Sequence, residues 1–367
     1  MEIEILKNLN EKNKKENFTI SPLGIEILLS LLSNGAEGET QEEILKLLNY
    51  ENIEKANDFS KKIIAECQRN EGILNIATAI LTKVKSKINF VNKARTNYDA
   101  KVEELQNMDQ INRWAQNKTK NTIKKIIESL PPDVIMVLLN ALYFEANWQV
   151  QFDQNLSYDR EFYNLDKKTS FVRTSMLFYR GTLLNYYENE DIKAVKLYYE
   201  SKVESIHSVV ILPKDINLNF YLNKFTKEKY DEIIEGLNKE KEKVNFIMPK
   251  FEIEYKIDFS DILKDLGMKK AFTIDAELEG IYQNKQKQPI HVGQIIQKNY
   301  MKVNERGTQA GSVTELDVIL ECYMDKDPEA KDFIANKPFL FIIRDEKLPK
   351  DRDVIFFTKF CKVEENN

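Results

Sequence analysis

Residues Gly307–Leu320 read GTQAGSVTELDVIL, a segment that opens with small residues and continues with the alternation of a β-strand. Every second position from Thr308 to Val318 is uncharged, whereas the positions between them include Glu315 and Asp317. Successive side chains of a strand point to opposite faces, so the uncharged set would share one face. An ordinary surface loop would explain the small residues but not the alternation. The segment therefore predicts a flexible loop that can pack one face into a sheet.

The rest of the chain predicts helices first and strands later. Ser21 precedes Pro22, which is typical of a helix start with a serine cap and a proline in the first turn. A second helix is predicted over Gln110–Leu130 because prolines follow it directly. Strands dominate after residue 130, including Ile290–Val303 just before the anomalous segment. This order indicates an α+β fold with large, mostly antiparallel sheets.

Composition excludes several classes of protein. The net charge is −5, from 54 basic and 59 acidic residues, and no basic stripe indicates a nucleic-acid partner. No apolar stretch approaches the length of a membrane span. The three cysteines have no CxxC spacing, so neither a disulfide framework nor a metal site is expected. The first residues lack a secretory signal, which predicts cytoplasmic residence, with unconventional secretion as the alternative. No Gly/Ser-rich or Pro-rich linker interrupts residues 1–367, so one domain is expected.

The residues of common catalytic sites are missing. His207 and His291 are the only histidines, and each lies in or beside an apolar run that predicts a structural role. The sequence contains no GxSxG, P-loop, GxGxxG or HExxH motif. We therefore expect a protein that is not an enzyme, with an unrecognised hydrolase as the alternative.

The segment Glu305-Arg306-Gly307-Thr308-Gln309-Ala310 resembles the hinge of the serpin family, whose usual form is Glu-x-Gly-Thr-x-Ala. Further family motifs follow in family order along nearly the whole chain. They are Asn17–Leu23, Leu32–Thr40, Ile111–Trp114, Leu139–Phe144 with Trp148 and Phe152, Met248–Phe251 and Lys337–Phe339. Several spaced motifs in one order are far more specific than any single short match.

The resemblance implies a serpin fold, with helices, three β-sheets including a large central one, and an exposed reactive-centre loop at about residues 305–336. It implies a monomeric suicide inhibitor of serine proteases, or of cysteine proteases, that forms a covalent complex with its target. The cleaved loop then inserts into the sheet, and no cofactor or metal is needed. The hinge residues would be Glu305, Gly307, Thr308, Ala310 and Ser312. The alternative function on the same fold is a non-inhibitory binding or chaperone module.

The position of the reactive bond depends on the direction of counting. Counting from Glu305 in the family's manner places it at Glu321–Cys322. Counting back from Lys337 moves it toward Asp327, because this stretch is longer than usual. Three further residues in the window are alternatives, and they would suit chymotrypsin-like or trypsin-like proteases: Tyr323, Met324 and Lys326.

The resemblance also implies the shutter and breach regions, where the sheet opens. Ser21, Asn140, Trp148 and Gln297 stand at their positions, and Asn140 and Gln297 are expected to be buried and hydrogen-bonded near Ser21. The family commonly has a histidine where this chain has Gln297. Since a glutamine amide can both donate and accept, the network can form without the titrating side chain.

Overall fold

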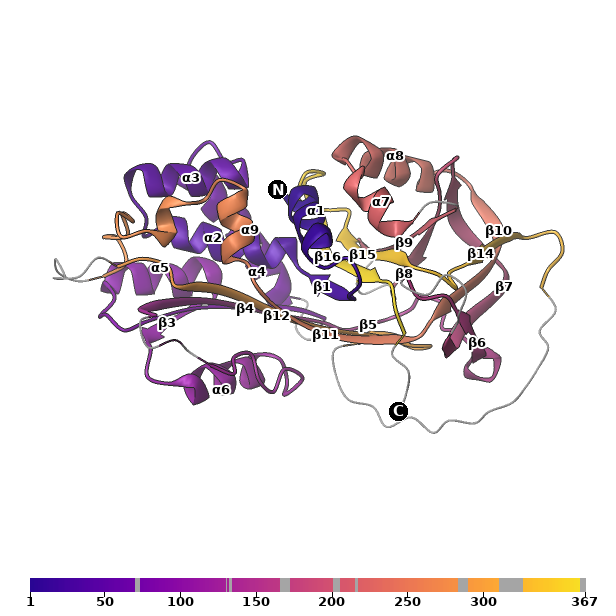
Figure 1. Cartoon of the computed structure of the whole chain (residues 1–367), viewed down its shortest axis with the longest axis horizontal. Helices are drawn as coiled ribbons and strands as arrows, with labels where there is room; N and C mark the ends of the chain where they lie inside the picture. Colours follow the sequence, from indigo (N-terminus) through magenta and orange to yellow (C-terminus); the bar gives the residue numbers. More distant parts are fainter. Residues whose placement is uncertain are drawn as a thin grey trace. The chain divides into compact units, whose positions relative to one another are not determined.

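A computed structural model describes nine stretches of the chain: 1–69, 73–129, 131, 134–165, 172–200, 205–214, 217–282, 290–309 and 326–363. The chain packs as two compact units, each built from separate stretches of sequence (Figure 1). The first unit contains Met1, Ser21–Phe144 and Glu254–Tyr300. The second contains Glu2–Ile20, Glu145–Ile253 and Met301–Asn367.

The first unit carries a buried helix that the sequence predicts. Helix α2 (Pro22–Ser33) begins after Ser21, whose hydroxyl accepts a hydrogen bond from the Gly24 amide at 3.1 Å. Proline at the first helical position needs no intrahelical partner for its nitrogen, so the start is stable. Every residue of α2 is buried. The remaining helical elements of this unit are α3 (Gly38–Leu48), α4 (Ile53–Arg69), α5 (Ile88–Tyr98), α6 (Met108–Lys118), α9 (Ser260–Asp265) and η3 (Lys270–Phe272).

The predicted helix over Gln110–Leu130 is wrong in its extent, because α6 ends at Lys118. The Asn112 side chain accepts hydrogen bonds from the amides of Ile126 and Ile127, and the Thr119 hydroxyl accepts one from Ile123. These side-chain bonds offer the backbone an alternative to the helical ladder. The isoleucines are buried by this irregular path.

Four strands pair within the first unit in the order β3–β2–β4–β12. They are β2 (Leu74–Thr82), β3 (Lys101–Glu104), β4 (Met136–Phe144) and β12 (Gln294–Val303), the last of which ends in the second unit. Strand β2 is antiparallel to β4, and β4 is parallel to β12 with Asn140 opposite Gln297. Helices α2 and α6 lie on opposite faces of this sheet (Figure 1). The alternation of side chains along β4 explains this. Val137 and Leu139 belong to the same buried apolar cluster as residues of α6, whereas Asn140 lies against Gly24 of α2.

The second unit is dominated by a sheet that runs β1–β16–β15–β9–β8–β7–β10–β14, with β6 also paired to β7. Its strands are β1 (Phe18–Ile20), β6 (Tyr158–Phe162), β7 (Val172–Glu188), β8 (Ile192–Tyr198), β9 (Ile206–Pro213), β10 (Lys241–Pro249), β14 (Lys331–Ile334), β15 (Phe339–Asp345) and β16 (Val354–Phe360). Its other elements are α1 (Glu2–Lys12), α7 (Leu218–Asn223), α8 (Lys227–Leu237), η1 (Gln154–Leu156), β5 (Ala146–Asn147), β13 (Gly307–Gln309) and the start of β11 (Phe251–Asp258).

The described strands form two sheets, of nine and seven strands, where the family resemblance implies three. The reason is the 17-residue strand β7, which pairs with β10 along much of its length and with β8 at its end. Because one continuous strand pairs on both sides, two sheets that would otherwise be separate are joined into one. Helices and sheets alternate irregularly along the chain, which confirms the predicted α+β class.

Helix α1 and strand β16, which lie far apart in the sequence, both belong to the second unit. Strand β1 is antiparallel to β16, with Thr19 opposite Thr358. The Lys359 ammonium is buried and donates to the carbonyl oxygens of Asn13 and Lys14, just beyond α1, at 3.0 Å each. Burial lowers the pKa of Lys359 to about 8. The groups that contact the ammonium are oxygen acceptors, which hydrogen-bond to its charged form. The first helix is therefore fastened to the last strand.

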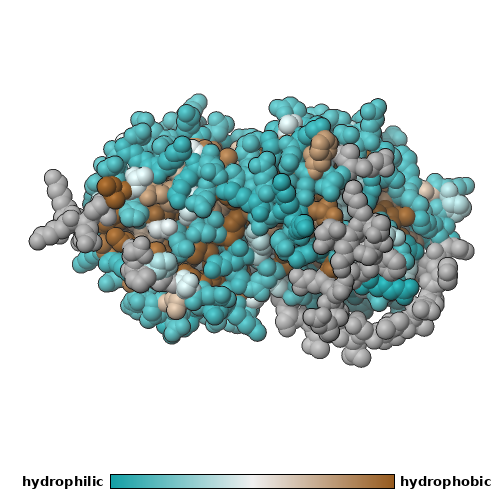
Figure 2. All heavy atoms as spheres, in the orientation of Figure 1, coloured by the Kyte–Doolittle hydropathy of each residue, from teal (hydrophilic) through white to brown (hydrophobic). Residues whose placement is uncertain are grey.

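No helix in the described part of the chain combines the length and apolarity that crossing a bilayer requires. The face in Figure 2 is mainly hydrophilic. The large hydrophobic side chains that are exposed come from separate elements: Ile88, Met108, Val150, Leu183, Phe220 and Ile274.

Candidate functional site

The predicted hinge begins as a strand inside a sheet. Strand β13 reverses the chain after β12, with Thr308 opposite Val303 in antiparallel register. On its other side β13 is antiparallel to β5, with Thr308 opposite Ala146. The start of the anomalous segment thus lies between two strands and is hydrogen-bonded to both. The predicted loop of residues 305–336 therefore carries strand structure at its ends, at β13 and at β14.

A tight turn joins β12 to β13, and Asn304 organises it. Its side-chain oxygen accepts from the amides of Arg306 and Gly307, at 3.0 and 3.2 Å. The Trp148 indole donates to the Asn304 carbonyl at 2.9 Å, and the Trp148 amide donates to the Arg306 carbonyl at 2.7 Å. Most polar groups of the turn are therefore held by side chains or neighbouring backbone, which fixes its shape.

Gly307 is required by the close approach of the neighbouring strand. A Cβ at this position would lie 2.1 Å from the Ala146 carbonyl oxygen and 2.7 Å from the Asn147 Cα. Real side chains do not tolerate such distances to backbone atoms, so only glycine allows β13 to pair here. The glycine of the hinge motif is thus explained by backbone packing.

Thr308 lies in a buried cluster of neutral side chains. Its side chain is 1% exposed, and its hydroxyl oxygen lies 2.8 Å from the Tyr199 hydroxyl oxygen. Tyr199 is also hydrogen-bonded to Ser208 and stacks on Trp148 with ring centroids 4.8 Å apart. Burial raises the pKa of Tyr199, so its phenol stays neutral. A charged side chain at position 308 would find no compensating charge in this cluster.

Glu305 anchors the upstream side of the turn. Its side chain is mostly buried, and its carboxylate lies 3.2 Å from the Lys250 ammonium. Its carbonyl accepts a hydrogen bond from the Phe152 amide at 3.0 Å. The motif that contains Lys250 and the motif that contains Phe152 thus both support the hinge.

A second polar cluster lies in the first unit, at the pairing of β4 with β12. Gln297 and Asn140 are fully buried, and the Gln297 amide donates to the Asn140 side-chain oxygen at 2.8 Å. It also donates to the Ser21 carbonyl at 2.9 Å. Its own oxygen accepts from the Ser21 amide and from the Asn299 side chain, at 2.8 Å each. All four hydrogen-bonding capacities of Gln297 are used, which explains how it replaces the histidine common in the family.

Asn140 completes this cluster. Its amide donates to the Ala77 carbonyl at 3.3 Å and to the Thr78 hydroxyl at 3.4 Å, both on β2. Trp148, the fourth residue predicted for this site, belongs to the second unit and contacts the hinge instead. The structure thus divides the four predicted residues between two clusters.

Several predicted site residues lie outside the described part of the chain. They are Ala310, Ser312, Glu321, Cys322, Tyr323 and Met324. Lys326 is described, and its ammonium lies 2.7 Å from the Asp332 carboxylate. The reactive bond and the later hinge residues remain predictions from the sequence.

Sequence reasoning missed the residues that surround the predicted ones. Tyr199, Ser208 and Asn304 contact the hinge or its turn, and Asn245 contacts the downstream end of the loop. Only Asn245 left a signal, since it is a polar residue within the apolar run of β10.

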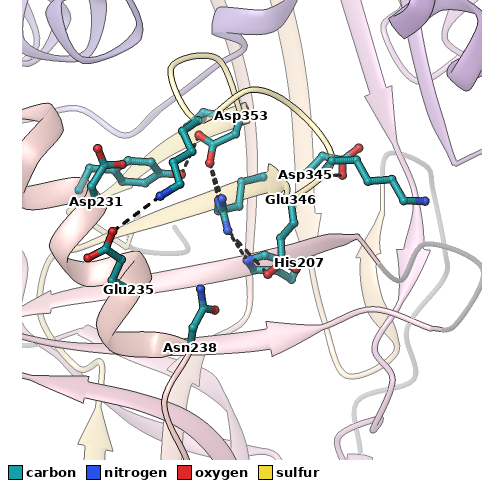
Figure 3. A network of polar contacts seen from close by, with 12 residues as sticks. His207, Asp231, Glu235, Asn238, Asp345, Glu346 and Asp353 are labelled. Atoms are coloured by element: carbon teal, nitrogen blue, oxygen red, sulfur yellow. Dashed lines mark hydrogen bonds and ion pairs between the residues drawn. The ribbon is translucent and has the colours of Figure 1, made fainter.

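A third buried polar group is formed by Arg344, Asp353 and His207 (Figure 3). Arg344 forms a buried ion pair with Asp353, and its other guanidinium nitrogen lies 3.1 Å from the His207 Nε2. Because arginine only donates, His207 accepts through Nε2 and carries its proton on Nδ1, which faces Glu346 at 3.5 Å. Burial, followed by the charges of Lys196 and Arg344, lowers the pKa of His207 well below its ordinary value. A neutral, fully buried histidine is consistent with the predicted structural role.

No group of three or more His, Cys, Asp or Glu side chains is placed to hold a metal ion in the described ranges. The clusters at the hinge and at the β4–β12 pairing are composed mainly of hydroxyls, amides and aromatic rings. Such groups can position backbone and exchange hydrogen-bond partners.

Comparisons with known proteins identify the family. The family model described as "Serpin (serine protease inhibitor)" matches residues 1–363. Serpin B5 of Xenopus laevis is 28% identical over 382 aligned residues, covering 98% of this chain and 94% of the relative. The chain belongs to the serpin family.

Solved structures agree. Serpin48 of the insect Tenebrio molitor, described as a highly specific serpin, superposes with a TM-score of 0.82 at 26% identity, covering 99% of this chain and 96% of that one. The thermophilic serpin tengpin in its native state gives a TM-score of 0.83 at 25% identity, covering 98% and 92%. The fold is therefore the serpin fold, whose members are generally protease inhibitors rather than catalysts.

Proposed function

We propose that this chain inhibits serine proteases by presenting its reactive-centre loop as a substrate and inserting that loop after cleavage. The observation that carries the proposal is strand β13. The chain turns back directly after Glu305 and enters a sheet between β12 and β5, with Thr308 buried there. The residues that follow Thr308 keep uncharged side chains at alternate positions through Val318. The sequence can therefore continue the strand that β13 begins.

Insertion would separate a pair of strands that now touch. Along the first part of β12 the partner is β4, from Gln294 opposite Val137 to Asn299 opposite Leu142. A new strand beside β12 must replace this parallel pairing with antiparallel pairing on both sides. The hydrogen bond between Gln297 and Asn140 lies on this pairing, so these residues are proposed to control its opening.

The covalent chemistry belongs to the protease. Its serine oxygen attacks the carbonyl carbon of the bait residue, the peptide C–N bond breaks, and the new amino terminus leaves with the proton. The upstream part of the loop is then joined to the protease by an ester. Insertion must move this ester before water hydrolyses it, because hydrolysis would release a cleaved substrate and an active enzyme. The native fold is thus held by a kinetic barrier that cleavage removes.

The test is a panel of proteases of different specificity. Each protease is incubated with the full chain, and the products are separated on a denaturing gel. We expect at least one protease to give a band that combines its mass with that of the upstream fragment. The same protease with its active-site serine chemically blocked is the control and must give no such band.

The result that contradicts the proposal is cleavage of the loop by many proteases with no covalent band for any of them. That result would favour the non-inhibitory alternative, a binding or chaperone role on the same fold. The alternate positions from 308 to 318 carry neither a charged side chain nor a proline, and this favours insertion over the non-inhibitory alternative.

A further inference from the structure

The downstream end of the loop is held by one buried amide. Asn245 of β10 is 1% exposed, and its side-chain oxygen accepts from the amides of Gly181 and Asp327, at 3.1 Å each. Its side-chain nitrogen donates to the Asp327 carbonyl at 2.9 Å and to the Asp332 carboxylate at 3.1 Å. An asparagine amide offers two acceptor sites and two donors, so every one of them is used.

The pairing of β10 with β7 is irregular beside Asp327, and this leaves space for its side chain. The register between β10 and β7 shifts between Val244 and Phe246, and this leaves Asn245 without a direct partner on β7. Gly181 of β7 has φ +54°, and a Cβ there would lie 2.6 Å from an Asp327 carboxylate oxygen. A bulge with a glycine in the left-handed region thus makes room for Asp327. We refer to Gly181, Asn245 and Asp327 as the clamp.

The residues on both sides of the Lys326–Asp327 peptide bond are held in place. The Asp327 amide and carbonyl are bonded to Asn245, and the same carbonyl accepts from the Ala330 amide at 3.2 Å in a turn. The Lys326 ammonium lies 2.7 Å from the Asp332 carboxylate. Hydrogen bonds from Lys326 and Asn245, with the charge of Lys193, outweigh burial and hold the pKa of Asp332 below its usual value.

A protease binds the residues around the bond that it cuts as an extended strand, paired to the enzyme through their backbone groups. The closed clamp already uses the backbone groups of Asp327, so cleavage at Lys326 requires local opening. Upstream, the next basic residue is Arg306, whose carbonyl is bonded to the Trp148 amide. Residues 307–325 contain neither lysine nor arginine.

We propose that the clamp is the downstream limit of the segment that proteases can reach, and that it excludes trypsin-like proteases from the targets of this chain. The statement about targets rests on the proposed inhibitory function, whereas the statement about the clamp does not. The bait bond then lies upstream of Lys326. It suits a protease that cuts after an acidic, aromatic or aliphatic residue or a methionine.

The experiment is limited proteolysis of the full chain by trypsin under native conditions. Mass spectrometry follows the rate at which the fragment that begins at Asp327 appears. We expect this cleavage to be slow in the wild type and about tenfold to a hundredfold faster in Asn245→Ala, because roughly two hydrogen bonds to Asp327 are lost. Asn185→Ala is the matched control, since Asn185 is a buried asparagine on β7 that bonds to the Lys239 carbonyl and leaves the clamp intact.

Two further measurements keep the proposal testable if Asn245→Ala does not fold. Gly181→Ala leaves Asn245 in place but displaces Asp327, and it should also accelerate cleavage after Lys326. Hydrogen exchange of the wild type should show a protected Asp327 amide. Rapid cleavage of the wild type after Lys326, or an unprotected Asp327 amide, overturns the clamp. A covalent complex with trypsin attached at Lys326 overturns the exclusion, and failure to trap any protease contradicts only the proposed function.

Discussion

Replacing Gln297 with the histidine common in the family should lower the stability of the folded protein. Gln297 makes four hydrogen bonds in a fully buried site, two as donor and two as acceptor. A neutral imidazole has one donor and one acceptor, so at least two partners lose their bonds. At about 1 kcal/mol each, Gln297→His should lower the free energy of unfolding by about 2 kcal/mol. For 367 residues the unfolding entropy is about 0.8 kcal/mol/K, which converts the loss into a midpoint about 2–3 °C lower.

The loss should grow in acid. A protonated imidazole has no acceptor for the Ser21 amide or the Asn299 side chain, both of which now donate to Gln297. The charged form is therefore disfavoured in the folded state, and the difference from wild type should increase as the pH falls below about 6.5. Thermal melts of both proteins between pH 5 and 8 measure it. Gln294→His is the control on the same strand, because Gln294 is partly exposed and bonds to Asp258. A Gln297→His protein that melts at or above the wild-type midpoint across this range would refute the reasoning.

Three further predictions concern the loop and the buried histidine. Thr308→Arg places a cation in the neutral Tyr199 cluster, so this variant should be cleaved without trapping the protease. Gln309→Arg, on the opposite strand face, should still trap the protease. Equal trapping by both variants on a denaturing gel would reject the insertion model. Cleavage of the loop should raise the thermal midpoint, since the sheet gains a paired strand, and identical melts before and after proteolysis would exclude an insertable loop. The unfolded state binds a proton at His207 more readily than the folded state does, so stability should fall as the pH drops below about 6.5. Urea titrations should show a flatter acid limb for His207→Gln, and parallel curves would contradict this.

The sequence predicted a strand after Glu305 but not the residues that surround it. The alternation after Gly307 indicates a strand, and β13 begins one at that residue. The requirement for glycine follows from the Ala146 carbonyl, a contact between residues far apart in the chain that no local pattern contains. The same limit applies to Tyr199 and Ser208, whose positions beside Thr308 depend on tertiary pairing.

Irregular backbone was the other limit. Helix α6 ends at Lys118, where Lys120 and Asn121 take left-handed backbone angles. The Asn112 side chain holds the irregular path that follows by accepting from Ile126 and Ile127, and periodicity cannot distinguish this path from a continuing helix. The clamp at Asn245 likewise depends on a register shift between β10 and β7. The start of α2, by contrast, was predicted correctly, because the Ser21 cap and the proline after it form a local signal.

The joining of the first helix to the last strand has a consequence for synthesis on the ribosome. Helix α1 and strand β1 are made well before their partners on β16, which begin at Val354, far later in the sequence. Translation proceeds at about 5–20 residues per second, so these early elements wait for tens of seconds. A chain that stops before residue 354 lacks the partner of β1. The sheet of the second unit is therefore completed only once β16 has been synthesised.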